Sequence, residues 1–405
     1  NYNYKMEERV KNVINGDRVL WVALALLSIF SFLPVFSASS NLAYVVGQGT
    51  PWSHLFKHFI VIVFGFVLMI VTHRVPYRYF KGISILALPL IIFLLIYTAS
   101  QGNLIDGANA NRWIKNPFVG FSFQTSNLAS VVLLTYVAHL ISKGSPKIFK
   151  FKSSIIPLWL PVFTVILLIL PANLSSAALL FLTILILIFL GGYPIKYLVS
   201  MFAVGLVLSA IFVLTAKSYP EIFPNRVDTW INRIENFGIS GENDGNYQIE
   251  RAKTAIVTGG LVGLGAGKSV MKNFLPQSSS DFIYAIIVEE FGLIGGTALI
   301  LLYLIVLFRI IVIANKANTV FGKLLVLGLG FPVIIQAFVN MGVALQVLPV
   351  TGQTLPLISS GGTAAWMTCI AFGIILSVSS TPNEESFEPD EDNKYNPIAI
   401  LSETT

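Results

Sequence analysis

Charged residues are scarce in this chain of 405 residues. They make up 11% of it, while hydrophobic residues reach 55%; a typical soluble protein is roughly 25% charged. Between Asp17 and Glu221 the only carboxylate side chain is that of Asp106. Mean hydropathy is +0.76, so lipid rather than water is the expected solvent for most of the chain. This composition excludes an ordinary water-soluble fold.

Cysteine and histidine are also rare. The single cysteine, Cys369, excludes an intramolecular disulfide. Four scattered histidines argue against a histidine-built metal site, and the pair His54 and His58 fits an ordinary helix end better than a metal site. The net charge of +6 would suit a nucleic-acid binder, but Lys and Arg lie between apolar runs instead of in one patch. We therefore expect no nucleic-acid partner.

Long apolar runs dominate what is present. About 20 apolar residues span a bilayer as a helix, and this rule predicts ten spans, at residues 19–39, 55–73, 82–99, 122–142, 155–171, 173–190, 197–216, 281–308, 321–345 and 361–380. We predict an all-α polytopic membrane protein. Its parts are a cytoplasmic tail (1–18), a ten-helix transmembrane domain (19–380) that includes one large extracytoplasmic loop (217–280), and an acidic, disordered cytoplasmic tail (381–405).

The basic residues indicate the orientation. With the N-terminus in the cytoplasm, the inner segments and both tails hold 16 Lys and Arg, whereas the short outer segments hold only Lys57, Arg112 and Lys115. The other seven lie on the 217–280 loop, where length makes the positive-inside rule count little. Both termini are therefore expected inside and the long loop outside.

Asp281 is the first candidate for chemistry. It opens the predicted eighth span, so its carboxylate would lie at the outer interface, within reach of water and lipid headgroups, where it could act as a general base. Alternatively, Asp281 caps the helix N-terminus, where a negative charge is favoured. Glu289 and Glu290 follow roughly 12–13 Å further along the same helix, on faces that cannot both line one cavity with Asp281. We expect Glu290 to pair with a polar group of a neighbouring helix.

Polar residues also mark the second outer segment. Arg112 offers a planar fork suited to a phosphate or diphosphate, and Trp113 offers an interfacial aromatic face. The alternative is a snorkelling arginine and a belt tryptophan that hold a helix end. Gln124 and Ser126 open the predicted fourth span, where hydrogen bonds between helices would explain them as well as a substrate would.

Two glycine-rich stretches remain. Residues 259–269 invite a phosphate-loop interpretation, but the glycine which that motif needs is replaced by Val262. Close backbone packing, or a turn that places Lys268 near lipid phosphates, explains them better. Residues 348–363 are rich in Pro and Gly, which predicts irregular backbone, and such backbone is tolerated at membrane depth only where protein buries it or it lines a wet cavity.

Taken in order, these pieces resemble the SEDS family (shape, elongation, division and sporulation), and its division branch most. The matching pieces are Gly107-Ala108, Arg112–Ile114, Phe123–Ser126, Asn225-Arg226, Asn232–Ile234, Tyr247-Gln248, the glycines of 259–267, Leu275-Pro276, Ser280–Ile283, Glu289–Gly292, Pro349–Gly352, Pro356, Ser359 and Gly361-Gly362.

The resemblance implies a peptidoglycan glycosyltransferase of the bacterial cytoplasmic membrane, at the division septum. It would polymerise lipid II, an undecaprenyl-diphosphate-linked disaccharide peptide, beside a class B penicillin-binding protein, other division proteins and membrane lipids. It implies Asp281 as the general base. Implied substrate-binding residues are Arg112, Trp113, Gln124, Ser126, Lys268, Ser269, Gln277, Thr351 and Ser359. Implied secondary or structural residues are Arg226, Arg233, Asn173, Glu289, Glu290, Pro349, Gly352, Gly361 and Gly362.

A diphosphate leaving group needs a cation, because negative charge accumulates on it as the bond breaks. The candidates are Arg112, Lys268, Arg226, Arg233 or a divalent ion such as Mg²⁺ or Mn²⁺. No other cofactor is expected.

The chain also departs from the family pattern. Asn127 and Gln277 replace the usual glutamates, Asn173 replaces a frequent acidic residue, and Thr125 replaces a proline, which favours a division role over an elongation role. A transporter or flippase of lipid-linked precursor stays open because of Glu289, and so does a non-catalytic division scaffold. A transporter would place ionisable groups near mid-bilayer, whereas here the polar motifs concentrate at the outer ends.

Overall fold

The computed structural model describes residues 15–44, 49–100, 104–105, 108–109, 113–115, 122–145, 148–218, 244–275 and 277–381. The chain divides into two compact units, each made of segments far apart in the sequence. Unit 1 comprises Asn1–Val71, Trp230–Arg309 and Val333–Gly373, and unit 2 comprises Thr72–Thr229, Ile310–Pro332 and Ile374–Thr405. Asp281 and the Pro- and Gly-rich segment 348–361 both belong to unit 1.

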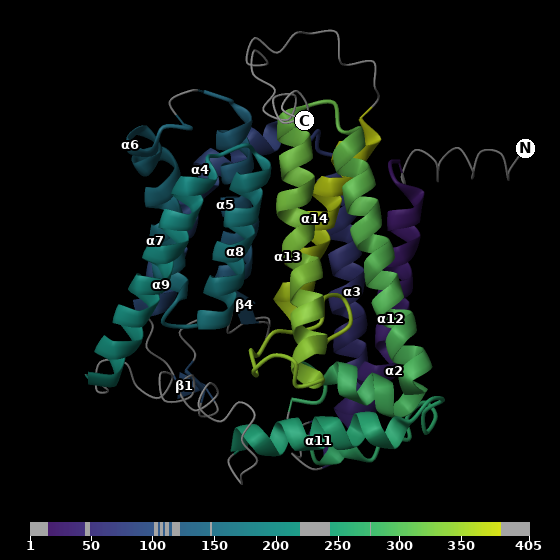
Figure 1. Ribbon diagram of the computed structural model, residues 1–405. Helices are drawn as coiled ribbons and strands as arrows, with labels where there is room; N and C mark the ends of the chain where they lie inside the picture. Colours follow the sequence, from purple (N-terminus) through teal and green to yellow (C-terminus); the bar gives the residue numbers. More distant parts are fainter. Residues whose placement is uncertain are drawn as a thin grey trace, which may run out of the picture. The chain divides into compact units, whose positions relative to one another are not determined.

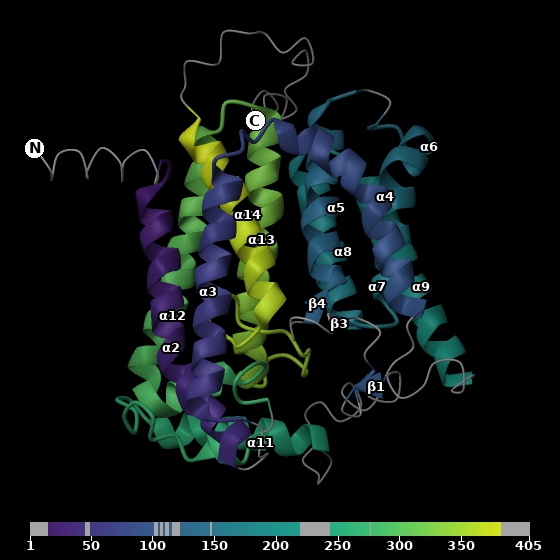
Figure 2. The same cartoon turned by 180° about the vertical axis from the view of Figure 1, so that it is seen from behind.

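Helices account for all ten predicted spans (Figures 1 and 2). Within the described residues, nine are long and apolar enough to cross a membrane. These are α2 (Arg18–Tyr44), α3 (Pro51–His73), α4 (Tyr79–Ser100), α5 (Thr125–Ser142), the continuous run of α6 (Phe151–Ser154), η1 (Ile155–Trp159) and α7 (Leu160–Ile169), α9 (Ile195–Ser218), α12 (Ile283–Lys316), α13 (Val320–Ala344) and α14 (Gly362–Ser380). The tenth, α8 (Leu174–Leu190), has 17 residues, the lower limit for a span.

The helix surfaces agree with a lipid environment. In the most apolar 18-residue stretch of α9, only 11% of the residues are buried, and in the corresponding stretches of α3 and α4 the buried share is 28%. Large side chains such as Leu86 and Ile156 are exposed. Helices that are apolar all round and remain exposed belong in a membrane. The prediction of an all-α polytopic membrane protein is confirmed.

Several predicted boundaries were wrong. The fourth span begins at Thr125, because residues 122–124 form a strand, β4 (Ser122–Gln124), which pairs antiparallel with β3 (Trp113–Lys115). A second two-stranded pairing joins β1 (Leu104–Ile105) to β2 (Ala108–Asn109). The fifth span begins at Phe151 and contains the wide turn η1 around Pro157, because proline has no N–H to donate to the preceding turn.

The eighth predicted span is not one straight helix. α12 consists of two helical segments that meet at Gly292, whose φ of 69° and ψ of −174° are non-helical. A side chain is rarely tolerated at such a φ, so glycine is required there. The kink comes after Asp281, Glu289 and Glu290, so all three lie on the N-terminal side of it.

A tight turn at residues 259–265, which we call the glycine turn, supplies the hydrogen bonds lost at this kink. Leu264 N–H and Gly265 N–H donate to the carbonyls of Glu289 and Glu290, each at 2.9 Å. In return, Leu293 N–H and Ile294 N–H donate to the carbonyls of Gly260 and Leu261, at 2.9 and 3.2 Å. Two carbonyls before the kink and two N–H groups after it thus find partners on the glycine turn, as backbone groups in lipid surroundings must.

The glycines allow this contact between backbones. A Cβ at Gly259 would lie 2.1 Å from Val288 O, one at Gly263 2.3 Å from Glu290 O, and one at Gly292 2.2 Å from Leu261 O. Close backbone packing, rather than phosphate binding, is therefore what these glycines provide. The turn follows α11 (Asp244–Gly259), which runs across the helices of unit 1 rather than along them (Figure 1).

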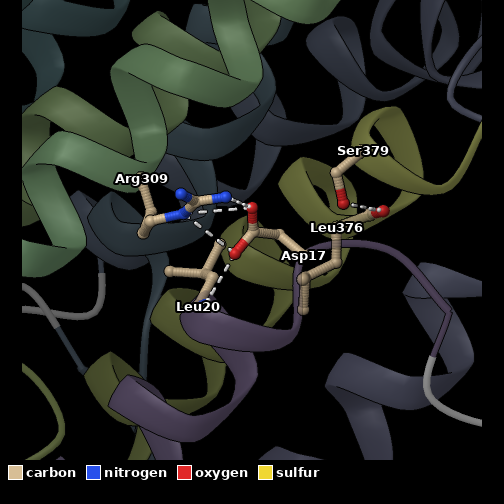
Figure 3. A network of polar contacts seen from close by, with 5 residues as sticks. All are labelled: Asp17, Leu20, Arg309, Leu376 and Ser379. Carbon is tan, nitrogen blue, oxygen red and sulfur yellow. Dashed lines mark hydrogen bonds and ion pairs between the residues drawn. The ribbon is translucent and has the colours of Figure 1, made fainter.

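An ion pair fixes the other end of unit 1. Arg309 Nε lies 3.1 Å from both carboxylate oxygens of Asp17, and its Nη2 donates to the same carboxylate (Figure 3). Asp17 also accepts a hydrogen bond from Leu20 N–H at 2.8 Å, as an N-cap residue does. One carboxylate therefore starts α2 and holds it to α12.

Candidate active site

Hydrogen bonds to three consecutive carbonyls hold the backbone around Asp281. The acceptors are the carbonyls of residues 279–281, and the donors are Asn340, Ser359 and Ser360; we call this group of residues the carbonyl clamp. Ser360 donates to Ser279 O from N–H at 3.0 Å and from Oγ at 2.9 Å. Ser359 Oγ donates to Ser280 O at 2.6 Å, and Asn340 Nδ2 donates to Asp281 O at 2.8 Å. Three consecutive carbonyls are thus fixed just before α12 begins, while the Asp281 residue stays half-buried.

The opposing segment, 348–361, is itself anchored to unit 1. Leu355 N–H donates to Ser359 Oγ at 2.8 Å, and Tyr303 Oη donates to Pro356 O at 2.5 Å. Asn340 Nδ2 donates a second bond, to Gln353 O at 2.7 Å. The predicted irregular backbone is confirmed, and contacts within unit 1 satisfy several of its polar groups, including the Gln353 and Pro356 carbonyls and the Leu355 N–H.

The carboxylate of Asp281 lies beside the backbone of Gly352. A Cβ built on Gly352 would come 3.6 Å from Asp281 Oδ2, and Gly352 has a φ of +68°. Thr351, its neighbour, is half-buried. The structure therefore brings together four predicted site residues: Asp281, Thr351, Gly352 and Ser359.

Backbone strain occurs on both sides of the carbonyl clamp. Gln277 and Leu357 have φ values of 59° and 62°, a region in which a bulky residue is a clear outlier. Such residues persist only where their surroundings over-determine them, and they cluster at functional sites. Gln277 is exposed, and its Oε1 accepts a bond from Ser280 Oγ at 2.7 Å.

The remaining predicted residues of the 348–363 region have local roles. Pro349 is half-buried in the irregular segment. Gly361 N–H donates to Ser359 O at 2.8 Å, and Gly362 begins α14. These residues shape the segment that faces residues 279–281.

Glu289 and Glu290 are both buried. Glu289 Oε1 accepts from Val270 N–H at 2.9 Å and from Met271 N–H at 3.1 Å, and its Oε2 accepts from Ser269 Oγ. Glu290 Oε1 accepts from Ser37 Oγ on α2, which confirms the expected pairing with a neighbouring helix. The two carboxylates therefore serve internal contacts rather than the surroundings of Asp281.

Two lysines lie near these carboxylates. Lys272 Nζ donates to Gly267 O at 2.8 Å and to Ser37 Oγ at 3.2 Å, so it ties the loop to α2. Lys268 is exposed. Ser269 is buried, and its hydroxyl is committed to Glu289. Of the predicted substrate contacts on the 217–280 loop, Lys268 and Gln277 are exposed and Ser269 is buried.

Other predicted site residues belong to unit 2. Gln124 Nε2 donates to Ser126 Oγ at 3.0 Å, and both residues are buried at the start of α5. Trp113 pairs with Gln124 across β3 and β4. Asn173 caps α8 by accepting from Ser176 N–H at 3.2 Å. Arg112, Arg226 and Arg233 lie outside the described residues.

A metal centre finds little support in the donor set. No group of three or more His, Cys, Asp or Glu side chains that could hold an ion occurs in the described part of the chain.

Sequence reasoning missed Asn340. Its signal was present: an amide side chain inside the apolar run 321–345 is expensive in lipid unless it has a structural or functional partner.

The fold and the site define a polytopic α-helical membrane protein whose irregular segments converge on one half-buried carboxylate. Residues 17–384 match the model of the FtsW/RodA/SpoVE family, described as cell cycle proteins. The chain belongs to this family, as the resemblance predicted.

Relatives and solved structures agree. The chain is 31% identical over 376 residues to the probable peptidoglycan glycosyltransferase FtsW of Geobacter sulfurreducens, covering 92% of this chain and 97% of the relative. It is 31% identical over 379 residues to the protein of the same name from Coxiella burnetii, covering 91% and 98%.

The fold is similar to a chain in a structure of a peptidoglycan synthase complex that coordinates polymerisation and crosslinking (TM-score 0.70, 23% identity, 92% of this chain and 99% of that one). It is also similar to the rod shape determining protein RodA of Thermus thermophilus (TM-score 0.64, 23% identity, 91% and 98%).

Proposed function

We propose that this chain is a peptidoglycan glycosyltransferase that polymerises lipid II at the outer face of the bacterial cytoplasmic membrane, with Asp281 as general base. Membership of the FtsW/RodA/SpoVE family supports the activity. The observation that carries the role of Asp281 is the carbonyl clamp, which fixes its backbone while its side chain stays half-buried beside Gly352. A general base must be held rigidly and still be reached by substrate.

The reaction is a displacement at a sugar carbon. The 4-hydroxyl of the acceptor N-acetylglucosamine gives its proton to the Asp281 carboxylate, and its oxygen bonds to the anomeric carbon of the donor N-acetylmuramic acid. The bond from that carbon to the diphosphate breaks, and undecaprenyl diphosphate leaves with the bonding electron pair. Direct displacement inverts the anomeric centre.

The leaving diphosphate needs a positive group. Lys268 is exposed on the loop that precedes Asp281, so it is a candidate within the described residues. Arg112, Arg226 and Arg233 remain predicted candidates. A fixed cation at this point would lower the barrier, because the charge develops only as the bond breaks.

The division role, the septal location and the class B penicillin-binding protein are part of the same proposal. The similarity to the FtsW relatives supports a division role over an elongation role. Similarity to a chain of a peptidoglycan synthase complex supports a transpeptidase partner. The positive-inside pattern supports two cytoplasmic termini.

The structure favours the polymerase over a transporter of lipid-linked precursor. Glu289 was the residue that kept transport open, and its carboxylate accepts three hydrogen bonds from residues 269–271. A carboxylate occupied in this way is poorly suited to carry an ion or substrate across the membrane.

The test is glycan-chain formation from purified lipid II by the detergent-solubilised protein, with and without a class B penicillin-binding protein. We compare the wild type, Asp281→Asn and, as a matched control, Glu250→Gln, an exposed carboxylate on α11. We expect polymer from the wild type and the control, and a loss of about 10²–10⁴-fold in Asp281→Asn, as for removal of a general base.

Two results would overturn the proposal. Polymerisation by Asp281→Asn at the wild-type rate would remove the base. No polymer from the wild type, even with the partner, would refute the polymerase, and lipid II translocation in vesicles would then test the transporter.

A further inference from the structure

Asn340 occupies an unusual position in the carbonyl clamp. It lies on α13, is 1% exposed, and uses one amide nitrogen to donate to two carbonyls, Asp281 O at 2.8 Å and Gln353 O at 2.7 Å. The two acceptors come from segments more than seventy residues apart in the sequence. Asn340 thus joins the segment that carries Asp281 to the segment that carries Gly352.

The orientation of this amide follows from its partners. Both neighbours are carbonyl oxygens, so the nitrogen must face them, since a flipped amide would place its own oxygen against two others. In the described part of the chain, Asn340 Oδ1 is buried without a hydrogen-bond partner. A buried acceptor is costly to leave unpaired, so the side chain keeps its two donated bonds at the expense of its own oxygen.

These two bonds bear on the geometry of the carboxylate. Asp281 Oδ2 lies next to Gly352, which immediately precedes Gln353. Asn340 therefore joins the backbone carbonyl of Asp281 to that of Gln353, and Gln353 directly follows the glycine that lies beside the Asp281 carboxylate. Ser359 and Ser360 hold only the two carbonyls before Asp281.

We propose that Asn340 is a positioning residue for glycosyl transfer: it sets the distance between the Asp281 carboxylate and the 351–353 backbone. The inference rests on the proposed function, because Asn340 takes no part in the reaction itself and acts only by positioning Asp281, the proposed base. A shift of about 1 Å in a reacting group costs about 10²-fold in rate, so loss of the amide acts on turnover more than on substrate binding.

The same helix offers a matched control. Gln336 lies one turn before Asn340, and its Nε2 donates to Thr354 O at 2.8 Å. It therefore makes the same kind of bond to the next carbonyl along the same segment, and among the described residues its side chain bonds to Thr354 and not to Asp281. Truncation of Gln336 removes the support of the segment without touching the Asp281 carbonyl.

The experiment measures kcat and KM for polymerisation of purified lipid II by the full-length chain with its penicillin-binding partner. The variants are Asn340→Ala, Gln336→Ala, Asn340→Gln and Asp281→Asn, and each is first checked for folding by its melting temperature. We expect kcat to fall about 10²-fold in Asn340→Ala with KM changed less than about two-fold, and to stay within about three-fold in Gln336→Ala. Asn340→Gln keeps the donors on a longer side chain, so it should regain part of kcat.

Equal kcat values for folded Asn340→Ala and Gln336→Ala would overturn the inference. If Asn340→Ala does not fold, Asn340→Leu, which keeps the side-chain volume and removes both donated bonds, takes its place, and a kcat equal to that of Gln336→Ala overturns the inference as well. The Asp281→Asn variant distinguishes failure of the positioning role of Asn340 from failure of the proposed function. If it is inactive while Asn340 variants behave like the control, only the positioning role fails, whereas an active Asp281→Asn removes the proposed base.

Discussion

The contact between the glycine turn and the kink of α12 predicts very different effects for two similar substitutions. Gly263 and Gly267 have nearly the same backbone conformation, with φ values of +86° and +78°. They differ in surroundings. A Cβ at Gly263 would lie 2.3 Å from Glu290 O and 2.5 Å from Gly292 N, whereas a Cβ at Gly267 meets nothing within 4 Å.

The free energies follow from these distances. Alanine in the left-handed region costs about 1–2 kcal/mol at either position. At Gly263 the obstructing atoms are backbone, so the turn must move away from α12 and weaken the four hydrogen bonds that join them. Each contributes about 1 kcal/mol, so Gly263→Ala should cost up to about 4 kcal/mol more than Gly267→Ala.

Thermal unfolding of the detergent-solubilised variants measures this difference. In chains of 150–250 residues, 1 kcal/mol corresponds to about 2–4 °C in Tm, and the shift per kcal/mol is smaller in a longer chain. We expect Gly263→Ala to melt several degrees below Gly267→Ala, or not to fold at all. Equal melting temperatures would refute the argument that backbone contact, rather than φ alone, requires glycine at position 263.

Two further predictions concern buried charges. Arg309 and Asp17 form a largely buried pair, so Asp17→Asn should lower the unfolding free energy by about 1–3 kcal/mol. The loss in the double variant with Arg309→Ala should be smaller than the sum of the two single losses. Additive losses in thermal unfolding would contradict the pairing. Both oxygens of Glu289 accept hydrogen bonds, whereas Glu290 Oε2 has no partner among the described residues. Glu289→Gln should therefore destabilise the protein more than Glu290→Gln, and the reverse order of melting temperatures would show that the contacts to residues 269–271 are weak.

The spans were predictable because the signal is local. An apolar run of about 20 residues has few stable alternatives to a membrane helix. The exceptions are equally physical. Residues 122–124 pair with residues 113–115 as strands. Strand pairing of this kind depends on the presence of a partner segment and not only on the apolar content of residues 122–124.

The kink at Gly292 could not be predicted in the same way. Gly292 stands in a run that also contains Gly295 and Gly296, and nothing in that run shows which of them takes a left-handed φ. The choice is made by contact with Gly260 and Leu261, about thirty positions earlier in the chain. Tertiary contacts of this kind override local helix preference.

For the site, the sequence placed Asp281 and the 348–361 segment at the same predicted face of the membrane, and the structure joins them through hydrogen bonds. The sequence did not reveal that the acceptors of these bonds are backbone carbonyls, because every residue has a carbonyl and the sequence does not show which ones accept hydrogen bonds. The donors Asn340, Ser359 and Ser360 are visible, but their partners are not.

The glycine turn has a consequence for the order in which the protein is made. Residues 259–265 precede residues 288–294 in the chain, and synthesis proceeds from the N-terminus. The groups that pair with the kink are therefore complete before the kinked part of α12 leaves the ribosome. We expect α12 to bend against a turn that already exists, so that the Glu289 and Glu290 carbonyls and the Leu293 and Ile294 N–H groups need not enter lipid unpaired.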